Sequence, residues 1–242
     1  MALNSRGFFY GGENIGDALD KIIGNLSGKK YKQYEGMIKF SIIGQPNVGK
    51  SSLVNAILNE DRVIVSPIEG TTRDAIDTPF VKDGKEYVVI DTAGIRRKGK
   101  VYEKIEKYAV LRALEAIERS DVVLLVLDAE TGIRNQDKHV AGYALDAGKP
   151  IIIVYNKWDI VDKDEMTMNT IIDKIRNEFV YLRYAPIAFV SAKNKKRINT
   201  LLPLIDDCHY YSNLRIATSV LNEVILDAQD FTPGPTINGK RL

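Results

Sequence analysis

The chain has 242 residues, 45% of them hydrophobic, and its 34 basic and 32 acidic side chains give a net charge of +2. This length supports one full hydrophobic core, and the balanced charge gives no overall attraction to DNA or another polyanion. Because Cys208 is the only cysteine, an internal disulfide is excluded, and with no signal peptide or apolar stretch of membrane-spanning length we predict a cytoplasmic protein without a membrane partner.

The first 36 residues carry patterns that differ from the rest. Between Ile15 and Leu26, apolar residues recur at helical spacing, which predicts an amphipathic helix. The following segment, Gly28 to Gly36, is polar and basic and is bounded by glycines, as is typical of a linker. The core domain is therefore expected to begin near Met37.

The predicted core domain begins with a phosphate-binding sequence pattern. The apolar run Ile38 to Ile43 predicts a buried strand, and it leads into Gly-Gln-Pro-Asn-Val-Gly-Lys-Ser at residues 44–51 and then a helix-forming run. Glycines at this spacing let backbone N–H groups surround phosphates, while Lys50 reaches the β- and γ-phosphates and Ser51 offers its hydroxyl to Mg²⁺. The candidate phosphate-binding residues are Asn47, Val48, Gly49, Lys50, Ser51 and Ser52.

Strands and helices then alternate, which favours a mostly parallel sheet covered by helices on both faces. Asp83-Gly84 between two apolar runs predicts a hairpin and hence one antiparallel strand. The fold class is α/β, a three-layer domain with a mixed, mostly parallel six-stranded sheet. The predicted strands are 38–43, 78–82, 86–91, 121–127, 150–155 and 186–190; the predicted helices after the first are 102–119, 136–147, 166–179, 198–209 and 217–229.

Two loops that follow predicted strands have the chemistry to recognise a base. Asn156-Lys157-Trp158-Asp159 follows one, and the carboxylate of Asp159 can accept both the N1–H and the 2-amino group of guanine, which adenine does not present in that arrangement. Lys157 would cover the ring, and Asn156 would tie this loop to the phosphate loop. In Ser191-Ala192-Lys193, a backbone N–H is expected to meet the guanine oxygen.

Two further segments suit the metal and γ-phosphate side of a nucleotide. Asp91-Thr92-Ala93-Gly94 ends a predicted strand, which places Asp91 beside the Mg²⁺ shell and the Gly94 N–H near the γ-phosphate. In Gly70-Thr71-Thr72-Arg73-Asp74, a threonine, assigned here as Thr72, can close over Mg²⁺. In this order, at the carboxyl ends of successive strands, the segments make the set of five guanine-nucleotide motifs.

These motifs resemble those of the Era-like GTPases, over residues 37–211. More narrowly, the phosphate loop, Gly-Thr-Thr-Arg-Asp, Asp-Thr-Ala-Gly-Ile-Arg-Arg-Lys-Gly-Lys and Asn-Lys-Trp-Asp resemble the second GTPase domain of the Der (EngA) tandem GTPases. The resemblance implies GTP or GDP and Mg²⁺ as ligands, and a GTP-hydrolysing switch in assembly of the large ribosomal subunit, with that subunit or its rRNA as partner of the full-length protein. It also implies truncated neighbours: residues 1–36 as the end of a preceding GTPase domain with its linker, and 212–242 as the start of a KH-like domain.

The route to hydrolysis departs from that of many GTPases. Where those carry a water-orienting glutamine after Asp-x-x-Gly, this chain has Ile95, which cannot bond to water. Asn47 resembles the asparagine that holds a potassium ion in related GTPases, with the loop from Ser66 to Thr71 completing its shell. The catalytic set implied is Asn47, Lys50, Thr72 and Gly94, with Thr71 as a further potassium ligand.

Several alternatives stay open at this point. Asn47 either holds potassium or only braces the loop, and the chain is either a hydrolysing switch or a docking module specific for GTP or GDP with negligible hydrolysis. The basic runs Arg96 to Lys100 and Lys193 to Arg197 contact RNA or a partner, or are solvated. We interpret Tyr181, Tyr184, Tyr210 and Tyr211 as packing residues, because they do not alternate with those charges.

Overall fold

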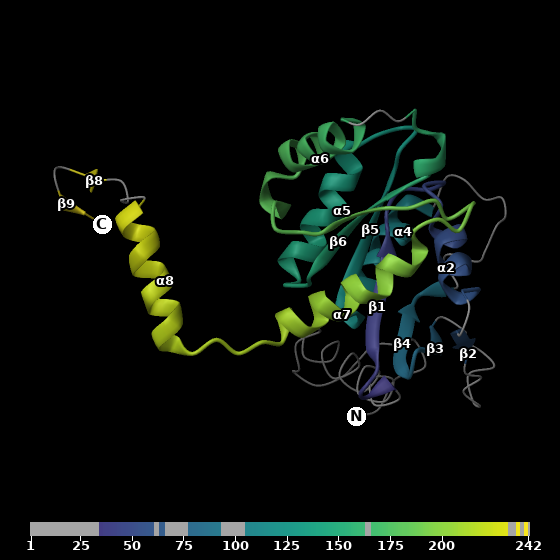
Figure 1. The fold of residues 1–242 in the computed structure, drawn as a ribbon, viewed down its shortest axis with the longest axis horizontal. Helices are drawn as coiled ribbons and strands as arrows, with labels where there is room; N and C mark the ends of the chain where they lie inside the picture. The colour runs from purple at the N-terminus through teal and green to yellow at the C-terminus, as the bar shows by residue number, and fades with distance from the viewer. Residues whose placement is uncertain are drawn as a thin grey trace, which may run out of the picture.

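A computed structural model of the chain describes residues 34–60, 63–65, 77–92, 105–162, 166–231, 236–237 and 240–241. Its centre is a seven-stranded sheet in the order β2-β3-β4-β1-β5-β6-β7 (Figure 1). The strands are β1 (Ile38–Ile43), β2 (Val63–Val65), β3 (Thr78–Lys82), β4 (Lys85–Ile90), β5 (Val122–Asp128), β6 (Ile151–Asn156) and β7 (Ile187–Phe189).

The sheet is mixed and mostly parallel, as predicted. Strands β4, β1, β5, β6 and β7 run parallel, while β3 pairs with β4 in the predicted antiparallel hairpin, in which Lys82 lies opposite Lys85. The prediction of six strands was wrong, because β2 adds a seventh by pairing antiparallel with β3. Its three residues, with Ile64 69% exposed, are too few to show a period-2 pattern in the sequence.

Helices cover both faces of the sheet, which gives the predicted three layers. Leu53 and Ile57 of α2 (Lys50–Leu58) and Leu201 and Ile205 of α7 (Leu201–Ser212) pack in one core cluster. The other cluster takes side chains from α4 (Ile105–Arg119), α5 (Asn135–Asp146) and α6 (Thr167–Glu178). Short 3₁₀ helices lie at η2 (Trp158–Ile160), η3 (Val180–Leu182) and η4 (Ile198–Thr200).

Strand β5 shows why the sheet is stable between these layers. All seven of its residues are buried; Leu124 and Val126 point into the α2–α7 cluster, and Leu125 and Leu127 into the opposite one. Each such side chain contributes about 1.5–3 kcal/mol by leaving water. A continuous apolar run is what a parallel strand covered on both faces requires, so the phosphate-loop strand β1 is held between β4 and β5 on a rigid support.

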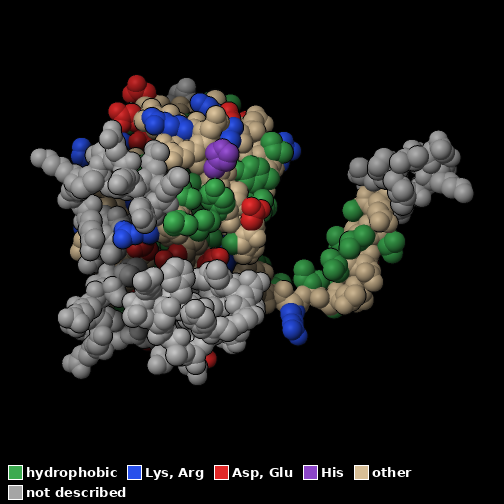
Figure 2. Space-filling view, turned by 180° about the vertical axis from the view of Figure 1, so that it is seen from behind, with side chains coloured by type: hydrophobic (Ala, Val, Ile, Leu, Met, Phe, Trp, Pro, Cys, Tyr) green, Lys and Arg blue, Asp and Glu red, His purple; other side chains and the backbone are tan. Residues whose placement is uncertain are grey.

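The chain beyond α7 runs away from the sheet. Helix α8 (Thr218–Phe231) stands apart from the three layers in Figure 1, followed by a two-stranded hairpin of β8 (Thr236–Ile237) and β9 (Lys240–Arg241). The apolar residues of α8, green along the extended arm in Figure 2, are largely exposed, and Val224 is 59% exposed. The predicted domain boundaries at 36/37 and 211/212 stay predictions, and the predicted helix at 15–26 lies outside the described residues.

The interpretation of four tyrosines as packing residues was wrong for three of them. Tyr184, Tyr210 and Tyr211 are more than 60% exposed. Only Tyr181 is partly covered, with its ring against Phe179 and its hydroxyl donating to the Lys138 carbonyl. Among the helices that the structure describes, none has the length and apolar character needed to cross a membrane.

Candidate nucleotide site

The phosphate loop leaves β1 and turns tightly into α2. Gly44, Asn47 and Gly49 all have positive φ, at 141°, 67° and 97°. A Cβ at Gly44 would lie 2.4 Å from the Val126 carbonyl oxygen of β5, so the loop passes against the neighbouring strand at a distance that only glycine allows. The loop therefore presents its backbone at the start of α2, where N–H groups have no partner within the helix.

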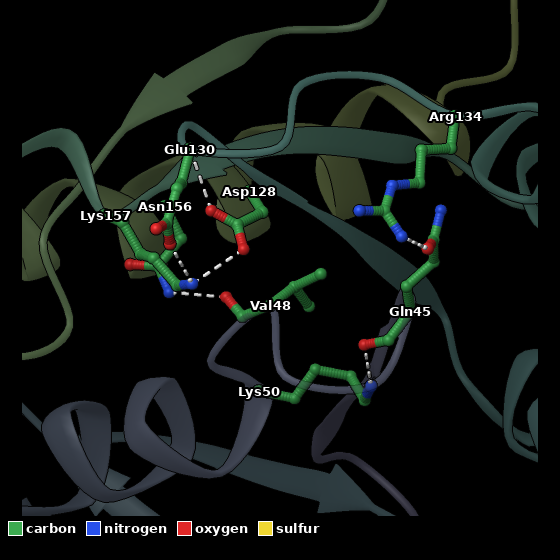
Figure 3. Close-up of polar contacts among 8 residues, drawn as sticks. All are labelled: Gln45, Val48, Lys50, Asp128, Glu130, Arg134, Asn156 and Lys157. Carbon is green, nitrogen blue, oxygen red and sulfur yellow. Dashed lines mark hydrogen bonds and ion pairs between the residues drawn. The ribbon is translucent and has the colours of Figure 1, made fainter.

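Asn156, at the end of β6, joins the phosphate loop to the Ser191-Ala192-Lys193 loop. Its Nδ2 donates to the Val48 carbonyl oxygen at 2.8 Å, and its Oδ1 accepts from the Ala192 N–H at 3.0 Å. The side chain is buried, and a Cβ at Gly49 would meet its Nδ2 at 2.3 Å (Figure 3 shows the bond to Val48). The bond to Val48 confirms the prediction that Asn156 ties its own loop to the phosphate loop, and the bond to Ala192, which the sequence did not predict, adds the loop after β7.

Replacement of Asn156 by alanine is expected to weaken GTP binding by about tenfold or more. The Val48 carbonyl and the Ala192 N–H would both lose a buried partner, so both loops would loosen although neither is changed in sequence. Nucleotide dissociation rates measured by fluorescence would test this. An unchanged dissociation rate in a variant that still folds would contradict the bridging role.

Lys50 lies folded back on the loop. Its Nζ donates to the carbonyl oxygens of Gly44 at 2.8 Å and Gln45 at 2.6 Å. Burial lowers the pKa of this ammonium to about 8, and the nearby carboxylate of Asp137 opposes the shift. The cation is thus poorly solvated and bound to neutral acceptors, and a phosphate oxygen would be a stronger partner.

The predicted base loops meet at the ends of β6 and β7. Asp159 accepts a hydrogen bond from Ser191 Oγ at 2.5 Å, which brings the two loops into contact. Lys157, in a left-handed conformation at φ 62°, points its Nζ to Asp128 at 2.7 Å and Glu130 at 3.2 Å (Figure 3). The hydrogen bond to Asp128 raises the pKa of Lys157, so the side chain stays charged. Lys193 lies in the exposed part of the turn after β7.

The predicted metal side of the site begins at the end of β4, next to β1 in the sheet. Asp91 has a left-handed backbone at φ 57°, and its N–H donates to Asp77 Oδ1 at 3.1 Å. Asp77 also forms an ion pair with Arg119 of α4, and the buried Thr92 shares a hydrogen bond with Thr78. Ser51 and Ser52 lie in the first turn of α2. The segment carrying the candidate Asp91 is therefore fixed from both sides.

Some predicted site residues cannot be placed. Thr71, Thr72, Gly94 and Ile95, and the basic run from Arg96 to Lys100, lie outside the described residues. Among those that can be placed, the structure brings together the phosphate loop, Asn156 and Ala192 in one group and Asp159 and Ser191 in an adjoining one.

Sequence reasoning missed three polar residues around this group. Asp128 ends β5 as a buried carboxylate and accepts from Lys157, and a carboxylate closing an apolar strand at the sheet edge was a usable signal. Asp137 and Gln45 gave no such signal, because Asp137 reads as an ordinary acidic residue in a helix first turn and Gln45 as a variable position of the loop.

Comparison with known proteins agrees with this geometry. Residues 39–157 match the family model described as 50S ribosome-binding GTPase. GTPase Der of Lactobacillus johnsonii is 61% identical over 231 residues, covering 96% of this chain and 53% of that protein; the Bacillus cytotoxicus protein of the same name is 58% identical over 232 residues. The chain spans about half the length of the curated relatives it matches.

Solved structures agree at the level of the fold. Era in complex with MgGDPNP and nucleotides 1506–1542 of 16S ribosomal RNA is similar with a TM-score of 0.55 and 26% identity, over 72% of this chain and 57% of that one. Aquifex aeolicus Era bound to GDP·AlF₄⁻ gives a TM-score of 0.52 and 28% identity, over 70% and 56%. Along 96% of its length the chain is thus about 60% identical to curated proteins named GTPase Der, and it shares the fold of the Era structures.

Proposed function

We propose that this chain binds GTP and GDP with Mg²⁺ and hydrolyses GTP, as a switch whose full-length protein acts in assembly of the large ribosomal subunit. The observation that carries the proposal is the Asn156 bridge, since one buried side chain bonds to the phosphate loop on one side and to the Ser191-Ala192 loop on the other. A fold that only needed a stable turn has no use for a link between these two loops. A nucleotide that reaches from the phosphate loop to the base loop requires these two loops to be held at a fixed distance.

The residues fit a triphosphate and its metal. Any side chain at position 44 would collide with the Val126 carbonyl oxygen, and any side chain at position 49 with Asn156 Nδ2. Because both positions are glycine, the loop backbone can surround a phosphate. Lys50 would exchange its carbonyl partners for β- and γ-phosphate oxygens. Ser51, Thr72 and Asp91 are the oxygen donors proposed for Mg²⁺, which when bound neutralises charge that develops on the phosphates.

Base selection is assigned to the second group of residues. Asp159 would accept the two guanine donors, oriented by the Ser191 hydroxyl, while the backbone N–H of Lys193, next to the Ala192 N–H that donates to Asn156, would approach the guanine oxygen. The aliphatic stem of Lys157 would cover the ring while Asp128 and Glu130 hold its ammonium.

Stimulation by potassium is proposed through Asn47. Its side chain lies on the exposed part of the phosphate loop, with a left-handed backbone, and Thr71 is the second proposed ligand. An added monovalent cation would supply positive charge at the γ-phosphate, where Ile95 supplies none. Gly94 is proposed to sense the γ-phosphate through its N–H.

The partners proposed for the full-length protein are the large ribosomal subunit or its rRNA, and the neighbouring GTPase and KH-like domains. A cytoplasmic location follows from that role. The support comes from the relatives named GTPase Der and the 50S ribosome-binding description of the matching family model.

Phosphate release from GTP, with ATP as control, in matched potassium and sodium buffers containing Mg²⁺ would test the enzyme proposal. We expect turnover with GTP only, and about tenfold or more faster in potassium, because one extra positive charge stabilises the transition state. Asn47→Ala should remove the difference between the two cations. Equal rates in both buffers would contradict the potassium site while leaving GTP binding intact.

A second candidate function rests on Ile95. With no water-orienting side chain at that position, the chain could bind GTP tightly and turn it over negligibly, serving as a docking module. Tight GTP binding with no measurable phosphate release in either cation would favour this function over the switch.

A further inference from the structure

Two buried polar atoms beside the phosphate loop have no hydrogen-bond partner among the described residues. They are Nε2 of Gln45, the second residue of the loop, and Oδ1 of Asp137, in the first turn of α5. Asp137 is only 2% exposed. Because an unsatisfied buried polar atom costs about 1–3 kcal/mol, such a pair calls for an explanation. One atom is a donor and the other an acceptor.

Other contacts bring these two side chains together. Arg134, just before α5, donates from Nη1 to Gln45 Oε1 at 3.4 Å and from its backbone N–H to Asp137 Oδ2 at 2.9 Å (the Arg134–Gln45 contact is drawn in Figure 3). With Oε1 held by Arg134, the Nε2 side of the Gln45 amide is left for Asp137. Burial raises the pKa of Asp137, and the Gln45 amide acts against that rise, as does the Lys50 ammonium.

The same glutamine also contacts the phosphate-binding lysine. The Gln45 backbone carbonyl accepts from Lys50 Nζ at 2.6 Å, so one residue connects α5 through its side chain to Lys50 through its backbone. Figure 3 shows Gln45 between Arg134 and Lys50. Movement of the Gln45 side chain would therefore displace the carbonyl against which Lys50 rests.

We propose that Asp137 is a positioning residue for the phosphate loop: the two atoms left without a partner, Asp137 Oδ1 and Gln45 Nε2, pair with each other after a small rotation of the Gln45 amide, and this bond fixes the loop turn that places Lys50. This inference rests on the proposed nucleotide function. The phosphate loop then has its binding conformation before the nucleotide arrives. Nucleotide affinity is higher because less conformational entropy of the loop is lost on binding. A contact made by α5, on the opposite face of the sheet from α2, thus supports the loop from outside the five motifs.

A polarity swap in the whole chain tests the contact. Asp137→Asn keeps an oxygen to accept the Arg134 N–H but turns a second amide donor toward Gln45 Nε2. Gln45→Glu turns a second carboxylate toward Asp137. We expect each to raise the dissociation constant for a fluorescent N-methylanthraniloyl GDP by about tenfold. The double variant restores one donor facing one acceptor at the original net charge, and its affinity should return to within about twofold of the unaltered chain.

Simple electrostatics makes the opposite forecast for one variant. Removing the Asp137 charge from the vicinity of a polyanion should tighten nucleotide binding, so an Asp137→Asn variant that binds as tightly as the unaltered chain, or more tightly, would overturn the inference. Losses that add in the double variant, instead of cancelling, would also overturn it. Absence of GDP binding by the unaltered chain would overturn the proposed function as well, which is a distinct result.

Two further variants separate positioning from folding. Gln45→Ala removes the amide without altering α5 and should give the same loss as Asp137→Asn. Asp206→Asn is the matched control, because this carboxylate accepts from Tyr87 and pairs with Lys85 away from the loop, and its GDP affinity should be unchanged. Melting temperatures without nucleotide should fall by only a few degrees in the single variants, since each leaves a buried polar atom without a partner. A variant that is largely unfolded at the assay temperature, so that its folded fraction accounts for the loss in affinity, would assign Asp137 a structural role only.

Discussion

Alanine at position 50 is expected to lower GTP affinity by about a hundredfold or more, the largest loss from any single change to the loop. The partly buried Lys50 ammonium is held by two carbonyl oxygens, so its side chain is already ordered before the phosphates bind. Among the described residues, Arg134 also contacts the loop, but it bonds to the side chain of Gln45 and so does not replace Lys50. Equilibrium titration with labelled GTP and GDP would measure the loss.

Stability measurements keep this prediction interpretable. The pKa of Lys50 is lowered to about 8 by burial, so folding disfavours its charged form, and this cost is present below that pH. It disappears as the pH rises and the ammonium loses its proton. Lys50→Met, which keeps the length of the side chain, should therefore leave the nucleotide-free protein at least as stable at pH 7. Retained tight GTP binding in either variant would remove the phosphate-loop assignment.

A matched lysine provides the control. Lys85 pairs with Asp206 at the far end of the hairpin, and its side chain is 60% exposed. Exposed pairs of this kind contribute about 1 kcal/mol or less to stability. Lys85→Ala should bind GTP as the unaltered chain does, which separates loss of a particular ammonium from loss of charge in general.

The sequence predicts those parts of the site whose functional residues lie close together in the chain. The phosphate loop carries its glycines, its lysine and its hydroxyl within eight residues after an apolar strand, and one short segment holds both Asn156 and Asp159. Because parallel strands bring their carboxyl ends to one edge, such segments can be assigned to a single site before any contact is known. The bond from Asn156 to the phosphate loop follows from the same rule.

What the sequence could not predict depends on contacts between distant residues. Gln45 and Arg134 are 89 positions apart, and neither has a pattern that marks it as the partner of the other. The seventh strand, β2, consists of three residues stabilised by pairing with β3, and so by tertiary context. The exposure of Tyr210 and Tyr211 was missed for a related reason: tyrosines that do not alternate with basic residues lack the pattern of an RNA-binding surface, but their burial still needs an element to cover them.

Replacement of Asp159 by asparagine is expected to change which base is bound. The aspartate would accept both the N1–H and the 2-amino group of guanine, whereas asparagine offers one acceptor and turns an amide donor toward another donor. A site that leaves buried donors facing each other discriminates strongly, so GTP affinity should fall by at least about a hundredfold. Ser191 can still donate to the asparagine oxygen, which preserves the contact between the two loops.

Titration with xanthosine triphosphate distinguishes a change in base recognition from a general disruption of the binding site. It carries an oxygen where guanine carries the 2-amino group, and so accepts from the new amide; its affinity should rise in the Asp159→Asn variant while that of GTP falls. The phosphates are identical, so Lys50 contributes equally to both ligands. Parallel losses for the two nucleotides would indicate a collapsed loop, and unchanged GTP affinity would show that the base is recognised elsewhere.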